Sequence, residues 1–201
     1  MSEITDGVRR RRRRSDAERS AAAILDAAVR VMGQRPEASV EEIASAAGVT
    51  RQTVYAHYPS RQALLDAVIE RITGEVIAAI EAARLDEDTA SVALLRWLDT
   101  SWRVMERYPL LLHPSVTSAG PEDSYAHHAP ILGRLRELIH RGQRSGEFDP
   151  SQPADWLIAA IIAVGHAAGD EVAAERMTMA AAATELRTSV LRLCQAPAAE
   201  S

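Results

Sequence analysis

Two helix-start signals with a glycine between them, in residues 39–58, constrain the fold more than any other feature of this chain. Ser39-x-x-Glu42 has the spacing of a capping box, in which the two side chains satisfy backbone amides at a helix start. Gly48 follows where this helix should end, because glycine readily adopts the left-handed conformation that turns the chain. Thr50 can then cap a second helix. The stretch therefore predicts two short helices joined by a tight turn, at residues 40–47 and 51–58.

Helical periodicity covers nearly all of the remaining chain, so we expect an all-α fold. Apolar residues recur at three- and four-residue spacing, and alternating runs typical of strands are few. A further capping box, Ser15-x-x-Glu18, predicts the start of the first helix. Prolines and the segment SGEFDPSQP mark breaks, and the longest irregular stretch is expected at 114–128. The other helices are expected near residues 15–33, 61–83, 89–107, 109–113, 129–144, 153–174 and 176–194.

Composition excludes several classes of protein. We find no unbroken apolar run of about 18 residues, so no membrane span is expected. The arginine-rich start lacks the apolar segment of a signal peptide. The single cysteine, Cys194, excludes an internal disulfide framework and fits the reducing cytoplasm. Residues 1–61 carry more arginines than carboxylates, whereas the rest of the chain is acidic, which suggests two modules.

The sequence offers no catalytic arrangement, so we expect neither an enzyme nor a cofactor. It contains no G-x-S-x-G, no phosphate-binding glycine loop and no C-x-x-C. His127 and His128 lie near Glu122 and Asp123, but adjacent histidines point in different directions. A polar loop is therefore favoured there over a metal site. Cys194 lies on an apolar helical face and is expected to pack.

The second short helix has one apolar side and one polar side. On a helical wheel, Val54 and Tyr58 fall together, and Gln52, Tyr55 and Ala56 fall opposite. Residues 40–58 thus have the spacing of a helix-turn-helix, with a short polar face that suits the major groove of DNA.

The run SVEEIASAAGVTRQTVYAHYPSRQALLDAV resembles the DNA-binding signature of the tetracycline-repressor (TetR) family of bacterial regulators. The elements Ile-Ala, Ala-Gly-Val, Tyr-x-His-aromatic and Ser-Arg agree in order and without gaps, and the resemblance covers about residues 15–70. It implies a three-helix DNA-binding domain followed by a helical domain that binds a ligand and dimerises. On this basis we expect a basic disordered arm at 1–14, the DNA-binding domain at 15–60, the ligand-binding and dimerisation domain at 61–195 and a tail at 196–201.

Eight residues are expected to contact DNA. Hydroxyls at helix starts can meet phosphates at Ser39 and Thr50. By the resemblance, Tyr55, His57 and Arg61 occupy phosphate-contacting positions. The expected base readers are Arg51 for guanine, Gln52 for adenine and Thr53 for the thymine methyl group. The run Arg9 to Arg14 is either a solvated tail or an arm that enters the minor groove.

The rear domain offers candidates for a ligand pocket and a dimer interface, although each set could instead be core. Pockets between helices favour aromatic walls with a few polar groups, and the candidates are Trp97, Trp102, Met105, Tyr108, Leu112, His113, Tyr125 and Trp156. Small and apolar residues at helical spacing predict a four-helix interface between two subunits, at Ala159, Ala163, Ala167, Ala183, Leu186, Val190 and Leu193.

The sequence therefore predicts a homodimeric, cytoplasmic transcriptional regulator. We expect a repressor that leaves a palindromic double-stranded operator when an unidentified small molecule binds. The alternative is a nucleoid or division-type DNA-binding factor of the same fold without a small-molecule effector.

Overall fold

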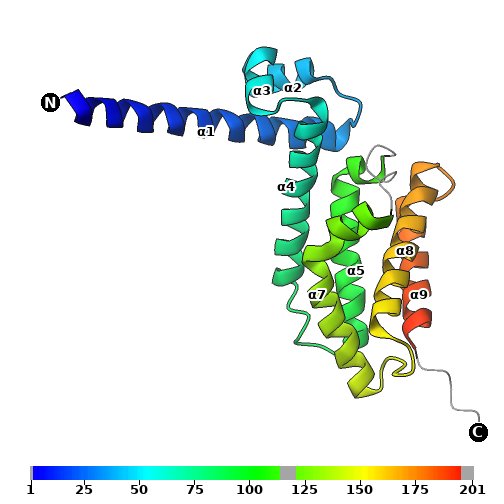
Figure 1. Cartoon of the computed structure of the whole chain (residues 1–201). Coiled ribbons are helices and arrows are strands. Elements are labelled where there is room, and N and C mark those ends of the chain that lie inside the picture. Colours follow the sequence, from blue (N-terminus) through cyan, green and yellow to red (C-terminus); the bar gives the residue numbers. More distant parts are fainter. Residues whose placement is uncertain (1, 114–120, 196–201) are drawn as a thin grey trace, which may run out of the picture. The chain divides into compact units, whose positions relative to one another are not determined.

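The computed structural model describes the backbone of residues 2–113 and 121–195 and the side chains of residues 17–113 and 131–195. Every element in these ranges is a helix, which confirms the all-α prediction. The chain divides into two compact units, and the division falls inside the fourth helix, between Ile72 and Thr73. Figure 1 shows the elements in order: α1 (Ser2–Gln34), α2 (Val40–Ala47), α3 (Arg51–His57), α4 (Arg61–Ala82), α5 (Ala90–Arg107), the 3₁₀ helix η1 (Pro109–Leu112), α7 (Pro121–Ser145), α8 (Ala154–Ala173) and α9 (Met179–Cys194).

The N-terminal unit, up to Ile72, contains the two short helices where the local signals predict them. The capping box is complete: Ser39 N donates to a Glu42 carboxylate oxygen at 2.8 Å, and Glu42 N donates to Ser39 Oγ at 3.2 Å. Gly48 ends α2 in the left-handed conformation, with φ of 68°. Thr50 Oγ1 accepts a hydrogen bond from Thr53 N at 3.1 Å, which caps α3. These caps satisfy amides that the ends of short helices would otherwise leave free.

A small apolar core holds α2 and α3 together. Ile43 and Ala44 of α2 and Val54 of α3 are buried. Helix α1 packs against both short helices. Tyr58, at the end of α3, donates a hydrogen bond to Ala21 O of α1 at 3.3 Å. These contacts fix one side of α3 and leave its other side at the surface.

Helix α1 begins much earlier than predicted. It runs from Ser2, so the expected start at Ser15 is wrong, and the backbone of residues 2–14 is helical rather than disordered. Arginine has a high helix propensity, so nothing in the run Arg9 to Arg14 breaks a helix that continues on both sides. The side chains of this run lie outside the described residues, so the DNA-binding role of the arm stays a prediction.

The C-terminal unit, from Thr73 onward, is a helical bundle. Helices α8 and α9 pack together, α7 packs against α5 and α8, and α9 also packs against α5. Their shared core includes Leu94, Leu135, Leu157 and Val190. Cys194 is fully buried in it, as expected, and burial raises the pKa of its thiol to about 11.

Helix α7 is longer than the sequence indicates. It begins at Pro121, so part of the stretch expected to be irregular is helical, and the helix runs through Pro130, where a break is predicted. Proline forfeits one backbone hydrogen bond within a helix, a loss that packing can offset. Helix propensity and the positions of prolines are therefore not sufficient to predict where α7 begins.

Helix α8 is, by length and composition, apolar enough to cross a membrane, with a mean hydropathy of 1.4. Only 28% of the apolar stretch is buried within the chain. A core helix of a soluble protein has the same composition. Asp155, Asp170 and Glu171 lie near the two ends of the helix, and length and composition alone are weak evidence for a membrane span.

Candidate functional site

The residues expected to read bases share the surface of α3. Arg51 and Gln52 are exposed, Thr53 is half-buried, and Val54 beside them is buried in the core. Tyr55 and His57, the expected phosphate contacts on the same helix, are half-buried. The structure thus brings five of the eight candidates together on one short helix whose opposite side is held by α1 and α2.

Two side-chain pairs order the surface of α3. The Arg51 guanidinium lies 5.4 Å from the centre of the Tyr55 ring, and its Nη2 donates to the Tyr55 hydroxyl at 3.5 Å. The hydrogen bond with Tyr55 raises the pKa of Arg51 above its ordinary value. One turn away, the hydroxyls of Thr50 and Thr53 lie 2.8 Å apart and share a hydrogen bond. The helix therefore presents ordered polar groups rather than free side chains.

The hydroxyl groups of Ser39 and Thr50 are both engaged in the hydrogen bonds of helix caps. Besides accepting from Glu42 N, Ser39 Oγ donates to the Glu42 carboxylate at 3.0 Å. The hydrogen bond from Ser39 N is the main cause of a lowered Glu42 pKa, so this carboxyl stays ionised at neutral pH. A negative charge next to Ser39 works against a phosphate contact through its hydroxyl.

Arg61 has a structural role that the sequence does not reveal. Its Nη2 donates to Pro36 O at 2.6 Å and lies 3.5 Å from Ala38 O, both in the connection between α1 and α2. The guanidinium thus ties the start of α4 to this connection. No local pattern could have identified these partners, because they are backbone carbonyls about 25 residues away in the sequence.

The expected ligand residues differ in how far they are exposed. Trp97, Trp102 and Tyr108 are buried, while Met105, Leu112 and His113 are half-buried. Trp156 is 60% exposed on α8, and its assignment to a ligand pocket stays a prediction. The side chain of Tyr125 lies outside the described residues. Among the described residues, no group of three or more histidine, cysteine or acidic side chains could hold a metal ion, and the residues His127 and His128 lie outside that range.

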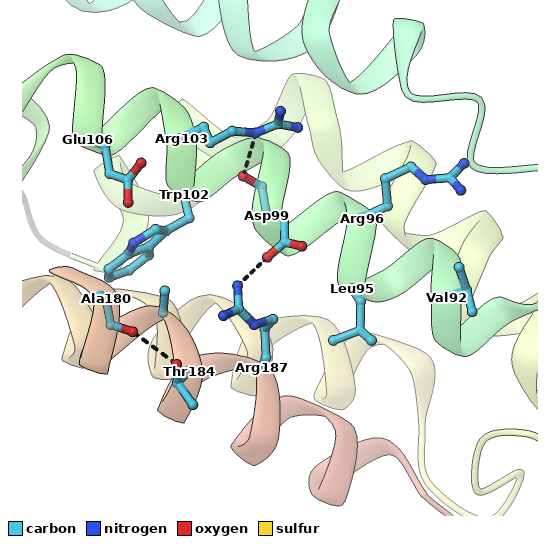
Figure 2. A pocket seen from close by; sticks show the side chains of 11 residues that line it. Val92, Leu95, Arg96, Asp99, Trp102, Arg103, Glu106, Ala180, Thr184 and Arg187 are labelled. Atoms are coloured by element: carbon cyan, nitrogen blue, oxygen red, sulfur yellow. Dashed lines mark hydrogen bonds and ion pairs between the residues drawn. The ribbon is translucent and has the colours of Figure 1, made fainter.

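An open groove of about 730 Å³ lies between α5 and α9. It is lined by Trp102 and Ala183 as well as by charged side chains. Figure 2 shows Arg187 of α9 extending to Asp99 of α5, and the two groups form an ion pair at 2.6 Å. Charged side chains therefore line much of the groove. Of the residues expected to bind a ligand, Trp102 is the one in its lining.

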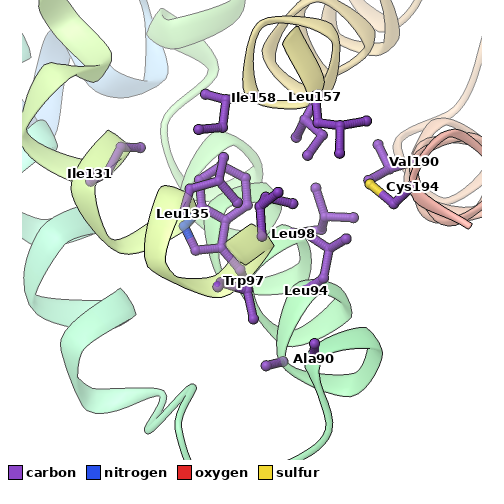
Figure 3. Packing of buried hydrophobic residues seen from close by; sticks show 14 of the residues in the cluster. Ala90, Leu94, Trp97, Leu98, Ile131, Leu135, Leu157, Ile158, Val190 and Cys194 are labelled. Atoms are coloured by element: carbon purple, nitrogen blue, oxygen red, sulfur yellow. The ribbon is translucent and has the colours of Figure 1, made fainter. Parts of the chain in front are cut away.

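Helix α5 also carries buried polar atoms without partners. Figure 3 shows the Trp97 ring beside Leu135, within the core of the C-terminal unit. Trp97 Nε1 and Ser101 Oγ, one helical turn apart, have no hydrogen-bond partner among the described residues, and neither has Trp102 Nε1. A buried polar group without a hydrogen bond lowers the stability of the fold, so such groups in a native structure usually have a partner such as a water molecule or a ligand.

The expected interface residues separate into two groups. Ala159, Ala163 and Ala167 are all exposed along α8. On α9 the burial favours the subunit's own core for most of the expected residues, because apolar spacing does not distinguish an interface from such a core. Ala183, Leu186 and Val190 are buried within the C-terminal unit, and Leu193 is half-buried.

The comparison with known proteins decides the family. The family model described as "Bacterial regulatory proteins, tetR family" matches residues 24–68. The HTH-type transcriptional repressor LfrR of Mycolicibacterium smegmatis is 30% identical over 184 residues, which cover 88% of this chain and 93% of the relative. The chain belongs to the TetR family. It is a transcriptional regulator rather than an enzyme.

Solved structures of TetR-like regulators share the fold. LfrR in complex with proflavine is 28% identical, with a TM-score of 0.60 and coverage of 90% of this chain and 99% of that one. RolR in complex with resorcinol is 19% identical, with a TM-score of 0.69 and coverage of 92% of each chain. A further relative was found by its sequence alone. It is the HTH-type transcriptional regulator Rv1255c of Mycobacterium tuberculosis, which is 30% identical over 182 residues that cover 88% of this chain and 87% of the relative.

Proposed function

We propose that this TetR-family regulator is a repressor that binds a palindromic operator as a homodimer and leaves it when a small molecule binds. The observation that carries the proposal is the polar face of α3, where Arg51 and Gln52 are exposed beside the buried Val54. A short helix held in this way on a helix-turn-helix can enter the major groove. The repressor name of LfrR supports the direction of regulation.

Within this interface, Arg51, Gln52 and Thr53 read bases, and Tyr55 and His57 contact phosphates. Ser39, Thr50 and Arg61 support the interface chiefly by holding the caps and the α1–α2 connection in place, since their polar atoms are already engaged there. The arginine run in α1 adds phosphate contacts outside the helix-turn-helix.

The effector is proposed to be a small aromatic molecule that binds in the C-terminal unit. Two relatives by fold are described in complex with aromatic ligands, proflavine for LfrR and resorcinol for RolR. In this chain, the unpaired Trp97 Nε1 and Ser101 Oγ supply a donor and a hydroxyl that an acceptor on such a ligand would satisfy. Met105, further along α5, and Tyr108, which follows this helix, would extend this lining.

Tyr108 provides a route from the ligand to α4. Its hydroxyl donates to a Glu75 carboxylate oxygen on α4 at 2.8 Å. Arg107 lies 5.2 Å from the Tyr108 ring centre and 3.8 Å from the same carboxylate. Helix α4 continues without a break into the N-terminal unit, so a shift of Tyr108 would bias the state that binds DNA.

The homodimer is proposed to form through α8. Its exposed stripe of Ala159, Ala163 and Ala167 permits close helix contact, and Trp156 lies on the exposed surface of the same helix. A second copy covering this face would bury apolar surface that a cytoplasmic protein otherwise leaves in water.

Selection from random duplex DNA, followed by titration of aromatic compounds such as proflavine, tests the proposal. A ligand-responsive repressor yields an inverted-repeat consensus, and at least one compound releases the selected duplex. Binding without any consensus would instead establish the nucleoid-type alternative, because such a factor tolerates all sequences.

A further inference from the structure

Arg51 and Tyr55 form one unit on the exposed side of α3. They are four residues apart, a spacing that places side chains next to each other on a helix. The guanidinium carbon lies 5.4 Å from the ring centre, and Nη2 lies 3.5 Å from the phenol oxygen. Within the described residues Arg51 makes no salt bridge, so Tyr55 is the group that restrains it.

This restraint matters for reading a base. An arginine side chain is long, and recognition of guanine requires its planar fork to meet O6 and N7 together. Stacking against an aromatic face limits the positions of the guanidinium without using all five of its N–H donors. The arginine can therefore remain stacked while it donates to a base edge.

The phenol hydroxyl can serve two partners at once. It accepts the hydrogen bond from Arg51 and still has its own proton to donate, since a phenol combines one donor with acceptor capacity. A phosphate oxygen of the operator is the acceptor that the proposed interface offers. The contact that positions the helix on the backbone would then also orient the base reader.

We propose that Tyr55 is a positioning residue that sets base specificity through Arg51, by holding the guanidinium stacked where it selects a guanine. This inference rests on the proposed operator binding. It assigns separate tasks to two parts of one side chain: the ring governs which base is preferred, and the hydroxyl governs overall affinity.

Three variants separate these tasks: Tyr55→Phe, Tyr55→Leu and Arg51→Ala. Each is tested on a set of duplexes in which the position read by Arg51 carries all four base pairs. Tyr55→Phe is expected to bind every duplex more weakly by a similar factor and to keep its preference for guanine. Tyr55→Leu is expected to lose about threefold of that preference, the effect of an exposed cation–π contact. In an Arg51→Ala background, Tyr55→Leu should change no base preference.

Two further readouts keep the outcome decisive. Tyr55→Gln has a polar group but no ring and must behave like Tyr55→Leu, and thermal unfolding identifies a variant that fails to fold. Unchanged guanine preference in Tyr55→Leu and Tyr55→Gln would overturn the positioning role, as would an Arg51→Ala variant with the wild-type preference. If the wild-type protein selected no consensus, the proposed function itself would fail instead.

Discussion

Glu147, which follows α7, caps a helix far away in the sequence. Its carboxylate accepts hydrogen bonds from Ala90 N and Ser91 N, the first amides of α5, both at 2.9 Å. These bonds, with a further one from Ser145, lower the pKa of Glu147 from 4.5 to about 2. One side chain thus stabilises both the start of α5 and the turn after α7.

The lowered pKa gives a pH-dependent prediction. The stabilisation is fully present above about pH 4.5 and is lost as the pH falls toward 2, because the folded state binds the proton less tightly than the unfolded state. Glu147→Gln should therefore lower the free energy of unfolding at pH 7 by about 1 kcal/mol, a modest value since solvent screens the group. Urea denaturation should show the difference shrinking between pH 4.5 and pH 3.

Glu137→Gln serves as the control, because Glu137 is an exposed residue of α7 whose ion pair with Arg134, at 3.6 Å, is of the surface type. If both variants lost equal stability at pH 7, or if the Glu147→Gln difference did not change with pH, Glu147 would not act as a cap.

At the residue scale, the sequence predicts the role of a residue where that role depends on residues close to it in the chain. Ser39, Gly48 and Thr50 act locally, and each has the predicted role in a cap or turn. Glu147 and Arg61 bind backbone groups of distant segments, so no spacing in the sequence identifies their partners.

At the element scale, Gly142 allows α7 to meet the turn that follows it. A side-chain carbon at this position would overlap the ring of the fully buried Phe148. Gly133, in the same helix, is exposed and has open space at the corresponding position. The two glycines therefore differ in packing within a single helix.

Alanine at these two glycines should have opposite effects. Gly142→Ala is expected to lower the free energy of unfolding by about 1–3 kcal/mol through overpacking. Gly133→Ala should raise it by about 0.5–1 kcal/mol, since alanine favours an exposed helix. Chemical denaturation of both variants measures these changes, and similar values for the two would show that Phe148 does not require the glycine.

Helix periodicity predicts the existence of the elements better than their ends. The starts of α1 and α7 lie well before the predicted ones, because Ser15 and Pro130 are compatible with a continuing helix. Periodicity also fails to separate a subunit core from an interface. Val190 and Ala163 fit the same small or apolar pattern, yet the first is buried and the second exposed.

At the scale of the whole molecule, the proposed dimer buries the exposed stripe of α8, which consists of Ala159, Ala163 and Ala167, against a second copy of the chain. Ala163→Glu would bury an unpaired carboxylate there. We expect the dimer dissociation constant to rise at least about tenfold, with operator affinity falling in parallel. Sedimentation and DNA titration measure both. Ala78→Glu, on the exposed surface of α4, is the control, and a dimeric Ala163→Glu protein with normal DNA binding would place the interface elsewhere.

The most direct test of the account is the symmetry of the complex on a selected operator. Footprinting shows which base pairs are protected, and analytical ultracentrifugation gives the number of chains per duplex. Two-fold assembly through α8 with one reading helix α3 per chain predicts two inverted half-sites, protected together by an even number of chains. Protection of a single asymmetric half-site by one chain would contradict it.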